Sequence, residues 1–294
     1  MPTAYDHVPR RVRFEDLCAV LAEGRPIYDA LPEDAAAVLR DAPRPLALTD
    51  FAGRDSVAAA MAWLAEHEVA TLVPVADVVP TRYGDWSVYE DNWQRMRDHL
   101  SRRFPSLVVA PWFVLEDVDL WRLLNGRYVN EIIQSFGFFT PCLGCHLHFY
   151  AMRAVLGSAL GAEVLISGEK ELHGSKRKAN QTTEAVEGYA AFSAAHGVDQ
   201  RFPIHKVTTE EQMGTLLGDG WREGERQLPC VMSGNDQGLD GRLLMSAEQI
   251  RAYMFEFAVP LATRIVALRR AGRSDADLQV QVDLAARALM AGRR

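Results

Sequence analysis

Short apolar runs alternate with longer amphipathic stretches along most of the chain. Each run has the length of a buried strand and ends in a polar or glycine-containing turn, and most are followed by apolar residues at helical spacing. Strands that alternate with helices predict a mainly parallel sheet covered on both faces. We predict five strands: Arg44–Thr49, Ala70–Val75, Leu107–Ala110, Glu163–Ile166 and Arg201–Val207.

Helical patterns flank the predicted sheet at both ends of the chain. Residues 1–43 indicate a helical leader, residues 44–242 the sheet-containing domain, and residues 243–294 a C-terminal helical segment in which Ser246 is a suitable N-cap. The predicted fold is therefore α/β, with a five-stranded, doubly wound, Rossmann-like parallel sheet. The main predicted helices are Tyr89–Arg103, Glu116–Ile133, the Cys142 region to about Leu160, Thr183–Ala195, Ser246–Arg270 and Ala276–Arg293.

Composition narrows the class of protein. With 48% hydrophobic and 24% charged residues, the 294-residue chain is typical of a globular protein, and its net charge of −7 argues against broad binding to nucleic acid. The N-terminus lacks the apolar core of a secretion signal, and no apolar run approaches the roughly 20 residues that span a bilayer. We therefore expect a cytoplasmic protein without a membrane partner. Thiols stay reduced there, so a cysteine cluster indicates metal binding or catalysis.

The turn Asp50–Ser56 joins the first predicted strand to a helix. The amino end of a helix presents backbone N–H groups and the positive end of its dipole, so it favours phosphate. Gly53 lets a ligand approach the backbone, Arg54 adds a positive charge, and Asp55 could hold a metal ion beside a phosphate. The alternative is that Asp55 or Ser56 only caps the helix.

A second loop, residues 167–181, follows the fourth predicted strand and therefore lies at the same edge of the sheet. Lys170, Lys176 and Lys178 bring positive charge to it. Such side chains stabilise the charge that grows on a phosphate during its transfer; the alternative is a solvated surface loop. Asn180 and Gln181 could read an amide or a nucleobase edge by paired hydrogen bonds.

The four cysteines fall into two groups. Cys18 lies alone in an apolar helical stretch, which indicates a small core residue. Cys142 and Cys145 form a C-x-x-C pair, and Cys230 follows a proline in a glycine-rich region. The last three residues could therefore act together if the fold brings them to one place.

Four interpretations of these three cysteines remain open. They could hold a structural zinc ion with His146 or His148, form a redox disulfide, attach haem, or bind an iron–sulfur cluster. Haem attachment of this kind requires export, for which the chain carries no signal. A four-iron cluster on three cysteines would keep one iron open to sulfide or to a substrate sulfur.

The first loop resembles the phosphate loop of the PP-loop ATP pyrophosphatase superfamily, the adenine nucleotide alpha hydrolase-like proteins. That loop reads Ser-Gly-Gly-x-Asp-Ser after the first strand. Gly53, Asp55 and Ser56 match it, while Phe51 and Ala52 replace the Ser and the first Gly. The resemblance covers roughly residues 44–235.

The cysteine layout is similar to one branch of this superfamily, the iron–sulfur-dependent tRNA 2-thiolation enzymes. That branch has a C-x-x-C on the helix after the third strand and a later cysteine that often follows Pro, as Cys230 follows Pro229 here. A Gly-containing loop that contacts ATP comes after the next strand, where this chain has Ser167-Gly168-Glu169. The branch usually has a Gly-His…Asp pattern at that place, and its zinc-finger modules are absent here.

The resemblance implies cofactors and site residues. It implies ATP, Mg²⁺ and a [4Fe-4S] cluster on Cys142, Cys145 and Cys230. The implied catalytic residues are Asp55, Lys176 and Lys178. The implied nucleotide-binding residues are Phe51, Ala52, Gly53, Arg54, Asp55, Ser56, Ser167, Gly168, Glu169 and Lys170.

The expected function is an ATP-dependent sulfurtransferase. It would adenylate a carbonyl or amide oxygen of a small, nucleobase-like molecule and replace that oxygen with sulfur. Sulfide or a cysteine-desulfurase-type protein would supply the sulfur, and we expect a homodimer. The alternatives are a tRNA thiolation enzyme, which the acidic net charge disfavours, a cluster-dependent desulfurase, and a zinc-stapled nucleotide-binding protein without sulfur chemistry.

Overall fold

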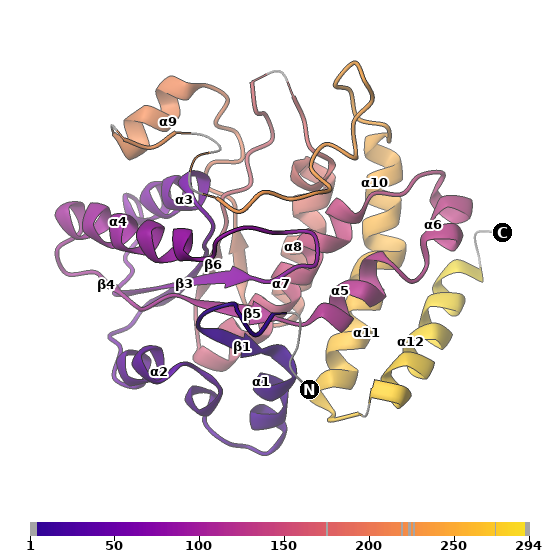
Figure 1. Cartoon of the computed structure of the whole chain (residues 1–294), viewed down its shortest axis with the longest axis horizontal. Coiled ribbons are helices and arrows are strands. Elements are labelled where there is room, and N and C mark those ends of the chain that lie inside the picture. The colour runs from indigo at the N-terminus through magenta and orange to yellow at the C-terminus, as the bar shows by residue number, and fades with distance from the viewer. Residues whose placement is uncertain are drawn as a thin grey trace.

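The computed structural model contains one parallel sheet with helices on both faces (Figure 1). It describes residues 5–174, 176–218, 220–222, 225, 227–273 and 275–291. The strands are β1 Arg11–Arg13, β2 Leu46–Asp50, β3 Thr71–Asp77, β4 Val108–Val109, β5 Phe113–Glu116, β6 Val164–Ile166 and β7 Asp199–Arg201. Their order is β1-β5-β3-β2-β6-β7, with β4 also paired to β3, and every pairing is parallel.

Twelve α-helices surround or extend the sheet within the described residues. They are α1 Phe14–Ala22, α2 Glu33–Arg40, α3 Arg54–Leu64, α4 Ser87–Arg103, α5 Val118–Asn125, α6 Val129–Phe136, α7 Pro141–Leu160, α8 Thr183–Ala195, α9 Glu210–Leu217, α10 Ala247–Tyr253, α11 Val259–Arg270 and α12 Asp275–Met290. A π-helical turn, Met254–Ala258, joins α10 to α11, and a 3-10 turn, Ala179–Gln181, precedes α8. No helix in the described part of the chain is long and apolar enough to cross a membrane.

Alternating strand residues build two cores, one on each face of the sheet. Leu46 and Leu48 pack with α1, α7, α8 and α11, whereas Ala47 between them packs with α3 and α4. This follows from the two-residue period of a strand, which sends successive side chains to opposite faces. Figure 1 shows α3 and α4 on one side of the strands and α7, α8 and α11 on the other.

Local sequence explains the boundaries of α7, the helix that carries two cysteines. The side chain of Thr140 accepts a hydrogen bond from the N–H of Cys142, and Pro141 follows at the first helical position. Gly161 ends the helix in the left-handed conformation, with φ of 64°. The predicted end of this helix, near Leu160, is confirmed.

The sheet has seven strands rather than the five predicted. β1 lies in the region predicted to be a helical leader, and β5 begins shortly after the predicted third strand, which forms only the short β4. The predicted fifth strand was wrong in position: β7 ends at Arg201, and residues 203–206 form a turn because Pro203 has no N–H to donate. The helix predicted at Glu116–Ile133 is two helices, α5 and α6, and the last residues of the predicted Ala276–Arg293 helix lie outside the described part.

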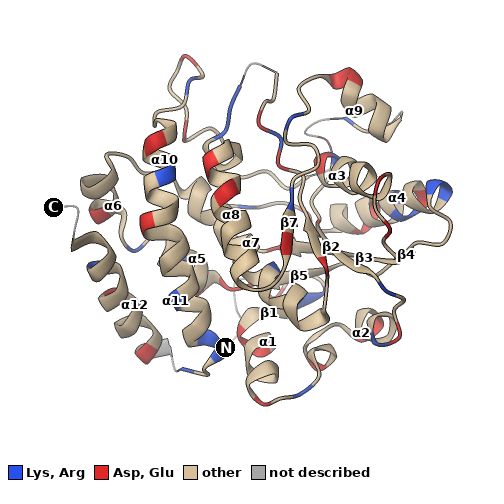
Figure 2. Cartoon of the chain, turned by 180° about the vertical axis from the view of Figure 1, so that it is seen from behind, with Lys and Arg blue, Asp and Glu red and all other residues tan. Residues whose placement is uncertain are grey.

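Lys and Arg positions are spread over several helices and loops of the backbone (Figure 2). Asp and Glu lie among them, for example on α8 and α10 in the same view. Basic and acidic positions are thus interspersed along the described part of the backbone in this view.

Candidate functional site

A large cavity opens where the central strands end. β2, β3 and β6 are parallel, so their carboxyl ends meet at one edge of the sheet, the usual place for a ligand in such folds. The cavity has a volume of about 460 Å³. It is lined by Asp50, Ala52, Gly53, Arg54, Asp55, Ser56, Arg82, Cys142, His146, Phe149, Arg153, Gly168, Glu169, His173, Lys178, Asn180, Gln181, Glu225, Gln227, Leu228, Pro229, Cys230, Ser233, Gly234 and Asp236.

The first predicted loop faces this cavity with residues Ala52–Ser56. Ser56 Oγ accepts a hydrogen bond from the N–H of Ala52 at 3.3 Å, which closes the turn before α3. Phe51 does not face the cavity: it is 1% exposed and packs against Tyr89 and Trp112 in the core. The position that carries a hydroxyl in the resembling family is thus a core position here.

Gly168 brings the second loop into direct contact with the first. A Cβ atom at Gly168 would lie 2.6–2.8 Å from the backbone of Asp55 and Ser56, closer than side chains normally come. The N–H of Gly168 also donates to both carboxylate oxygens of Asp50, at 3.2 Å each. Glycine is needed here for close approach of two backbone segments.

Replacing Gly168 with Ala is expected to lower the free energy of unfolding by about 1–3 kcal/mol, because the two loops must move apart. Urea titration of the purified variant measures the change. Gly214→Ala is the matched control, since a Cβ there meets no atom within 4 Å apart from its neighbours and the backbone of its own helix, and α9 gains a better helix former. Equal stability of the two variants would contradict the close contact.

The three cysteines of the motif meet at a smaller cavity of about 80 Å³. Its lining is Val79, Thr81, Arg82, Trp121, Pro141, Cys142, Cys145, His146, Phe149, Cys230 and Met232. Five of these residues, Arg82, Cys142, His146, Phe149 and Cys230, also line the large cavity. The thiols and the two predicted loops therefore belong to one continuous site.

Backbone pairing explains how Cys230 reaches α7. Val231 donates its N–H to the carbonyl of Thr81 at 2.9 Å, and Tyr83 donates to the carbonyl of Pro229 at 3.2 Å. These bonds fix residues 229–231 against the segment that follows β3. All four cysteines are free in the structure, and Cys18 is buried in the core as predicted.

Burial raises the pKa of the Cys142 thiol, and it raises the pKa of Cys145 to about 12. Polar neighbours act in the opposite direction: Asn235 donates to Cys142 Sγ at 3.2 Å, and Trp121 lowers the pKa of Cys145. Cys230 Sγ lies 3.4 Å from Thr81 Oγ1. Cys142 and Cys230 thus each have a hydrogen-bonding neighbour from a different segment.

The histidines near the motif are already engaged. His146 Nδ1 lies 2.7 Å from Glu169 Oε1, and its Nε2 lies 2.9 Å from Asn180 Nδ2. His148 is fully buried with Nε2 on the carbonyl of Asp117 at 2.8 Å, and it does not line the cysteine cavity. Among the residues that the structure describes, no three His, Cys, Asp or Glu side chains are grouped to hold a metal ion.

A polar network surrounds Glu169, which is 4% exposed. Its carboxylate accepts hydrogen bonds from Tyr150 and Gln181, both at 2.7 Å, besides the contact with His146. Burial alone would raise the pKa of Glu169, but His146 and these hydrogen bonds outweigh it and lower the pKa to about 2. The amide oxygen of Gln181 also lies 2.6 Å from His173 Nε2. Both ends of this amide are therefore engaged within the network, and the predicted hydrogen bonds to a ligand would have to replace these contacts.

A buried ion pair below the cavity is absent from the sequence prediction. Arg153 on α7 pairs with Asp77 at the end of β3, and both side chains are almost fully buried. Burial raises the pKa of Asp77 and of Asp50 to about 6, although Arg153 opposes the shift. Arg153 also lines the cavity, so it places positive charge in the cavity wall.

The predicted cationic residues lie in different surroundings. Lys178 lines the cavity. Lys176 is exposed, and its backbone forms an isolated antiparallel β-bridge with that of His173. Lys170 is 3% exposed and its amine lies 3.9 Å from Glu210 Oε1. Glu210 also accepts a hydrogen bond from Arg54 at 2.5 Å.

Ser167 is likewise buried outside the cavity. Its hydroxyl accepts a hydrogen bond from Gln200 at 3.1 Å. Of the implied nucleotide-binding residues, Ser167, Phe51 and Lys170 thus lie behind the cavity wall, and the remainder line it.

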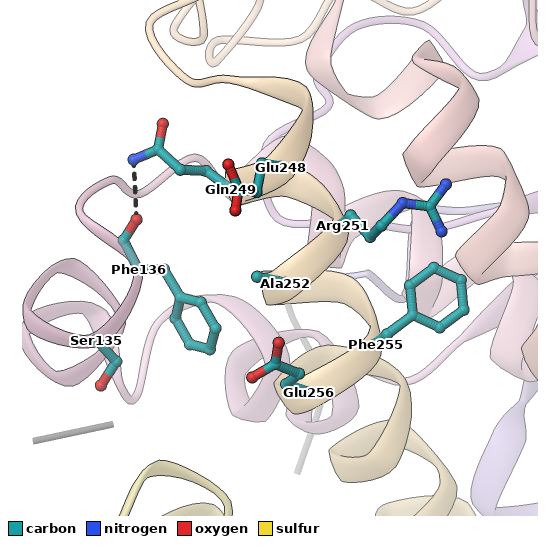
Figure 3. Close-up of a pocket in the computed structure, with 8 residues that line it drawn as sticks. All are labelled: Ser135, Phe136, Glu248, Gln249, Arg251, Ala252, Phe255 and Glu256. Carbon is teal, nitrogen blue, oxygen red and sulfur yellow. Dashed lines mark hydrogen bonds between the residues drawn. The ribbon is translucent and has the colours of Figure 1, made fainter. Parts of the chain in front are cut away.

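A further cavity, of about 490 Å³, lies between α6 and the helices α10 and Met254–Ala258 (Figure 3). Gln249 donates to the carbonyl of Phe136 across it at 3.0 Å, and Arg251 lies over the ring of Phe255. None of the predicted site residues lines this cavity, whose wall combines the buried ring of Phe136 with more exposed side chains.

Comparison with known proteins gives one relative that covers most of the chain. The uncharacterized protein MJ0009 of Methanocaldococcus jannaschii is 30% identical over 223 residues, which are 76% of this chain and 80% of the archaeal protein. The chain belongs to the MJ0009 family. A match over that share of the chain necessarily includes its middle, where α7 carries Cys142 and Cys145. No protein-family model matches the chain.

Proposed function

We propose that this member of the MJ0009 family is an ATP-dependent sulfurtransferase. One observation carries the proposal: the loop Ala52–Ser56, the turn at Gly168, and the thiols of Cys142 and Cys230 line a single cavity. A site that activates an oxygen with ATP and then replaces it with sulfur needs these two kinds of residue within reach of the same substrate atom.

The loop side of the cavity suits the phosphates of ATP. The start of α3 presents backbone N–H groups and the positive end of the helix dipole. Lys178 brings a charge that would stabilise the departing pyrophosphate, and Asp55 lies where a Mg²⁺ ion on the phosphates would need a carboxylate. Arg54 contacts Glu210 and would have to turn toward a bound phosphate.

The cysteine side suits a four-iron, four-sulfur cluster. Cys142, Cys145 and Cys230 line one pocket, and its remaining walls are mostly apolar or already hydrogen-bonded. A single zinc ion needs its thiolates to converge at about 2.3 Å from one point. In a four-iron cluster each thiolate binds its own iron atom, so the thiolates need not converge on one point. When bound, the cluster would hold and deliver the sulfide that enters the substrate.

The proposed reaction balances in two steps. The substrate oxygen attacks the α-phosphorus of ATP, the bond to the β-phosphate oxygen breaks, and pyrophosphate leaves. Sulfide then adds to the same carbon, and AMP leaves with the original oxygen. The net change is C=O to C=S with ATP and sulfide consumed, and no external oxidant or reductant is required.

The acceptor that we favour is a small nucleobase-like molecule. The volume of about 460 Å³ lies in the range of small-molecule sites, and Phe149 lines both this cavity and the cavity of the thiols. Arg82 lies over the ring of Phe149 at 5.1 Å, so a flat polar ring has both an aromatic and a cationic neighbour there. The net charge of −7 supports a small acceptor over tRNA.

Anaerobic purification tests the proposal. We expect a brown protein with about four irons per chain, equal acid-labile sulfide and little zinc. Incubation with ATP, Mg²⁺, sulfide and guanine should release AMP and pyrophosphate, and mass spectrometry should detect the exchange of oxygen for sulfur. A colourless protein with one zinc would remove the sulfur chemistry. Loss of sulfur from a thiolated base without ATP would indicate a desulfurase.

Lys178→Ala is expected to reduce kcat by about 10²-fold or more, because its charge would be lost where pyrophosphate departs. Lys176→Ala is the matched control. The resemblance implies a catalytic role for Lys176 too, but this exposed side chain does not line the cavity, so we expect kcat to change little. Initial rates of AMP release at saturating ATP measure both. Equal losses of kcat in the two variants would indicate that these lysines act only through the general positive charge of the loop.

A further inference from the structure

The segment of residues 230–237, which we call the bridging segment, touches both halves of the site. It begins with Cys230 at the thiol pocket and continues through two tight turns, Ser233 N–H to the carbonyl of Cys230 at 3.1 Å and Asn235 N–H to that of Met232 at 3.2 Å. The residue types of its last three positions, Asn235, Asp236 and Gln237, predict an ordinary turn from the sequence. Their contacts in the structure are specific.

Asn235 holds one of the cysteines. Its amide nitrogen donates to Cys142 Sγ at 3.2 Å, and its amide oxygen accepts from the hydroxyl of Thr140 at 2.8 Å. Thr140 is also the N-cap of α7 and accepts the N–H of Cys142. The orientation of Asn235 is therefore set by the start of the cysteine helix.

The next two residues hold the nucleotide side of the cavity. Asp236 is 1% exposed, and its carboxylate accepts the N–H of Ala179 at 2.5 Å. Gln237 donates to the carbonyl of Arg177 at 2.5 Å. These bonds fix the backbone on both sides of Lys178, whose side chain lines the cavity.

We propose that the bridging segment couples the two sites, so that a metal group on the cysteines tightens nucleotide binding at the loop that carries Lys178. The inference rests on the proposed function, since it takes a metal group at the cysteines and ATP at the loops. Ligation would restrain Cys230 and Cys142, and through Asn235 and Asp236 it would restrain Ala179. Nucleotide would then bind to a loop that is already ordered.

Coupling of this kind is reciprocal. If the loaded cysteines raise the affinity for nucleotide by some factor, bound nucleotide raises the affinity for the metal group by the same factor. The arrangement would limit ATP binding, and hence substrate activation, to protein that is ready to deliver sulfur.

The test compares the dissociation constant of a non-hydrolysable ATP analogue for the full chain in two states. One sample is reconstituted anaerobically with iron and sulfide, and the other is stripped with a chelator. We expect the loaded wild-type protein to bind the analogue about fivefold more tightly or better. Asp236→Ala should abolish this difference and retain its iron. Asp236→Asn keeps an oxygen acceptor for the N–H of Ala179 and should keep most of the difference in affinity.

Asp240→Ala is the matched control, because Asp240 lies in the same loop and its carboxylate accepts the N–H of Arg242 and pairs with the guanidinium of the same residue. If Asp236→Ala does not fold, Gln237→Ala provides the same test through the bond to Arg177. Equal affinity in loaded and stripped wild-type protein, or a difference that survives Asp236→Ala, overturns the coupling and leaves the proposed function intact. A protein that takes up neither iron nor zinc removes the proposed function, and the coupling with it.

Discussion

Alanine in place of Cys142, Cys145 or Cys230 is expected to reduce bound iron from about four atoms per chain to about one or fewer, and to abolish sulfur transfer. Each substitution removes one of three thiolates that line the same pocket, and no other cysteine in the described residues lines it. Iron, acid-labile sulfide and visible absorption, measured after anaerobic purification, report the loss.

Cys18→Ala is the control for this series. Cys18 is buried in the core beside α11, away from the thiol pocket, so its replacement should leave the iron content unchanged. The three site variants should remain soluble, because their side chains lie at a cavity rather than inside a packed core. Full iron content in Cys230→Ala would show that the cluster does not use this cysteine.

Arg153→Met is expected to lower the free energy of unfolding by about 3–5 kcal/mol near neutral pH. The substitution keeps the apolar length of the side chain but leaves the carboxylate of Asp77 buried without its partner. Asp50, whose pKa also depends on Arg153, loses a neighbouring positive charge at the same time. Urea unfolding at about pH 7.5 measures the change.

The size of this loss should depend on pH. In the native protein the pKa values of Asp50 and Asp77 are already raised to about 6, and removal of Arg153 raises them further. A carboxyl group whose pKa is higher in the folded than in the unfolded protein stabilises the fold fully below its unfolded pKa. This contribution is lost as the pH rises through the folded pKa. The deficit of the variant should therefore be larger at about pH 7.5 than at about pH 5. Adding Asp77→Asn to Arg153→Met should recover part of the lost free energy of unfolding. A loss of the same size at both pH values would indicate lost packing instead.

The central layers of the fold could be predicted from local signals. β2, β3 and β6 lie within a few residues of the predicted strands, because each is an apolar run bounded by turn residues. α8 begins and ends where predicted, since Thr182 caps its first turn by accepting the N–H of Ala185. Periodicity and caps are local, so they can be read without the tertiary structure.

The edges of the sheet could not be predicted in the same way. β1 contains two arginines in three residues, and its partner β5 lies about a hundred positions further along the chain. β7, at the other edge, is polar and only three residues long. Such strands have no apolar run of their own, and only pairing with a neighbour reveals them.

The site was predictable where backbone topology decides it. The loops Asp50–Ser56 and 167–181 were expected at one rim and meet there, because parallel strands end at the same edge. Side-chain direction was not predictable: Phe51 and Lys170 turn inward, whereas Lys178 reaches the cavity. Arg153 lies on a mostly apolar helix, and its ion pair with Asp77 depends on a strand far away in the sequence, so the sequence alone does not show it.

The charged β1 strand has a consequence for synthesis of the protein. It pairs with β5 at Val114–Glu116, so a chain made from its N-terminus must carry β1 unpaired until these later residues have emerged. An apolar strand left open for that time could join the edge of another chain, whereas arginines on an open edge discourage such pairing. The charges of Arg11 and Arg13 would thus protect the nascent chain from aggregation, and apolar replacements there should reduce the yield of soluble protein.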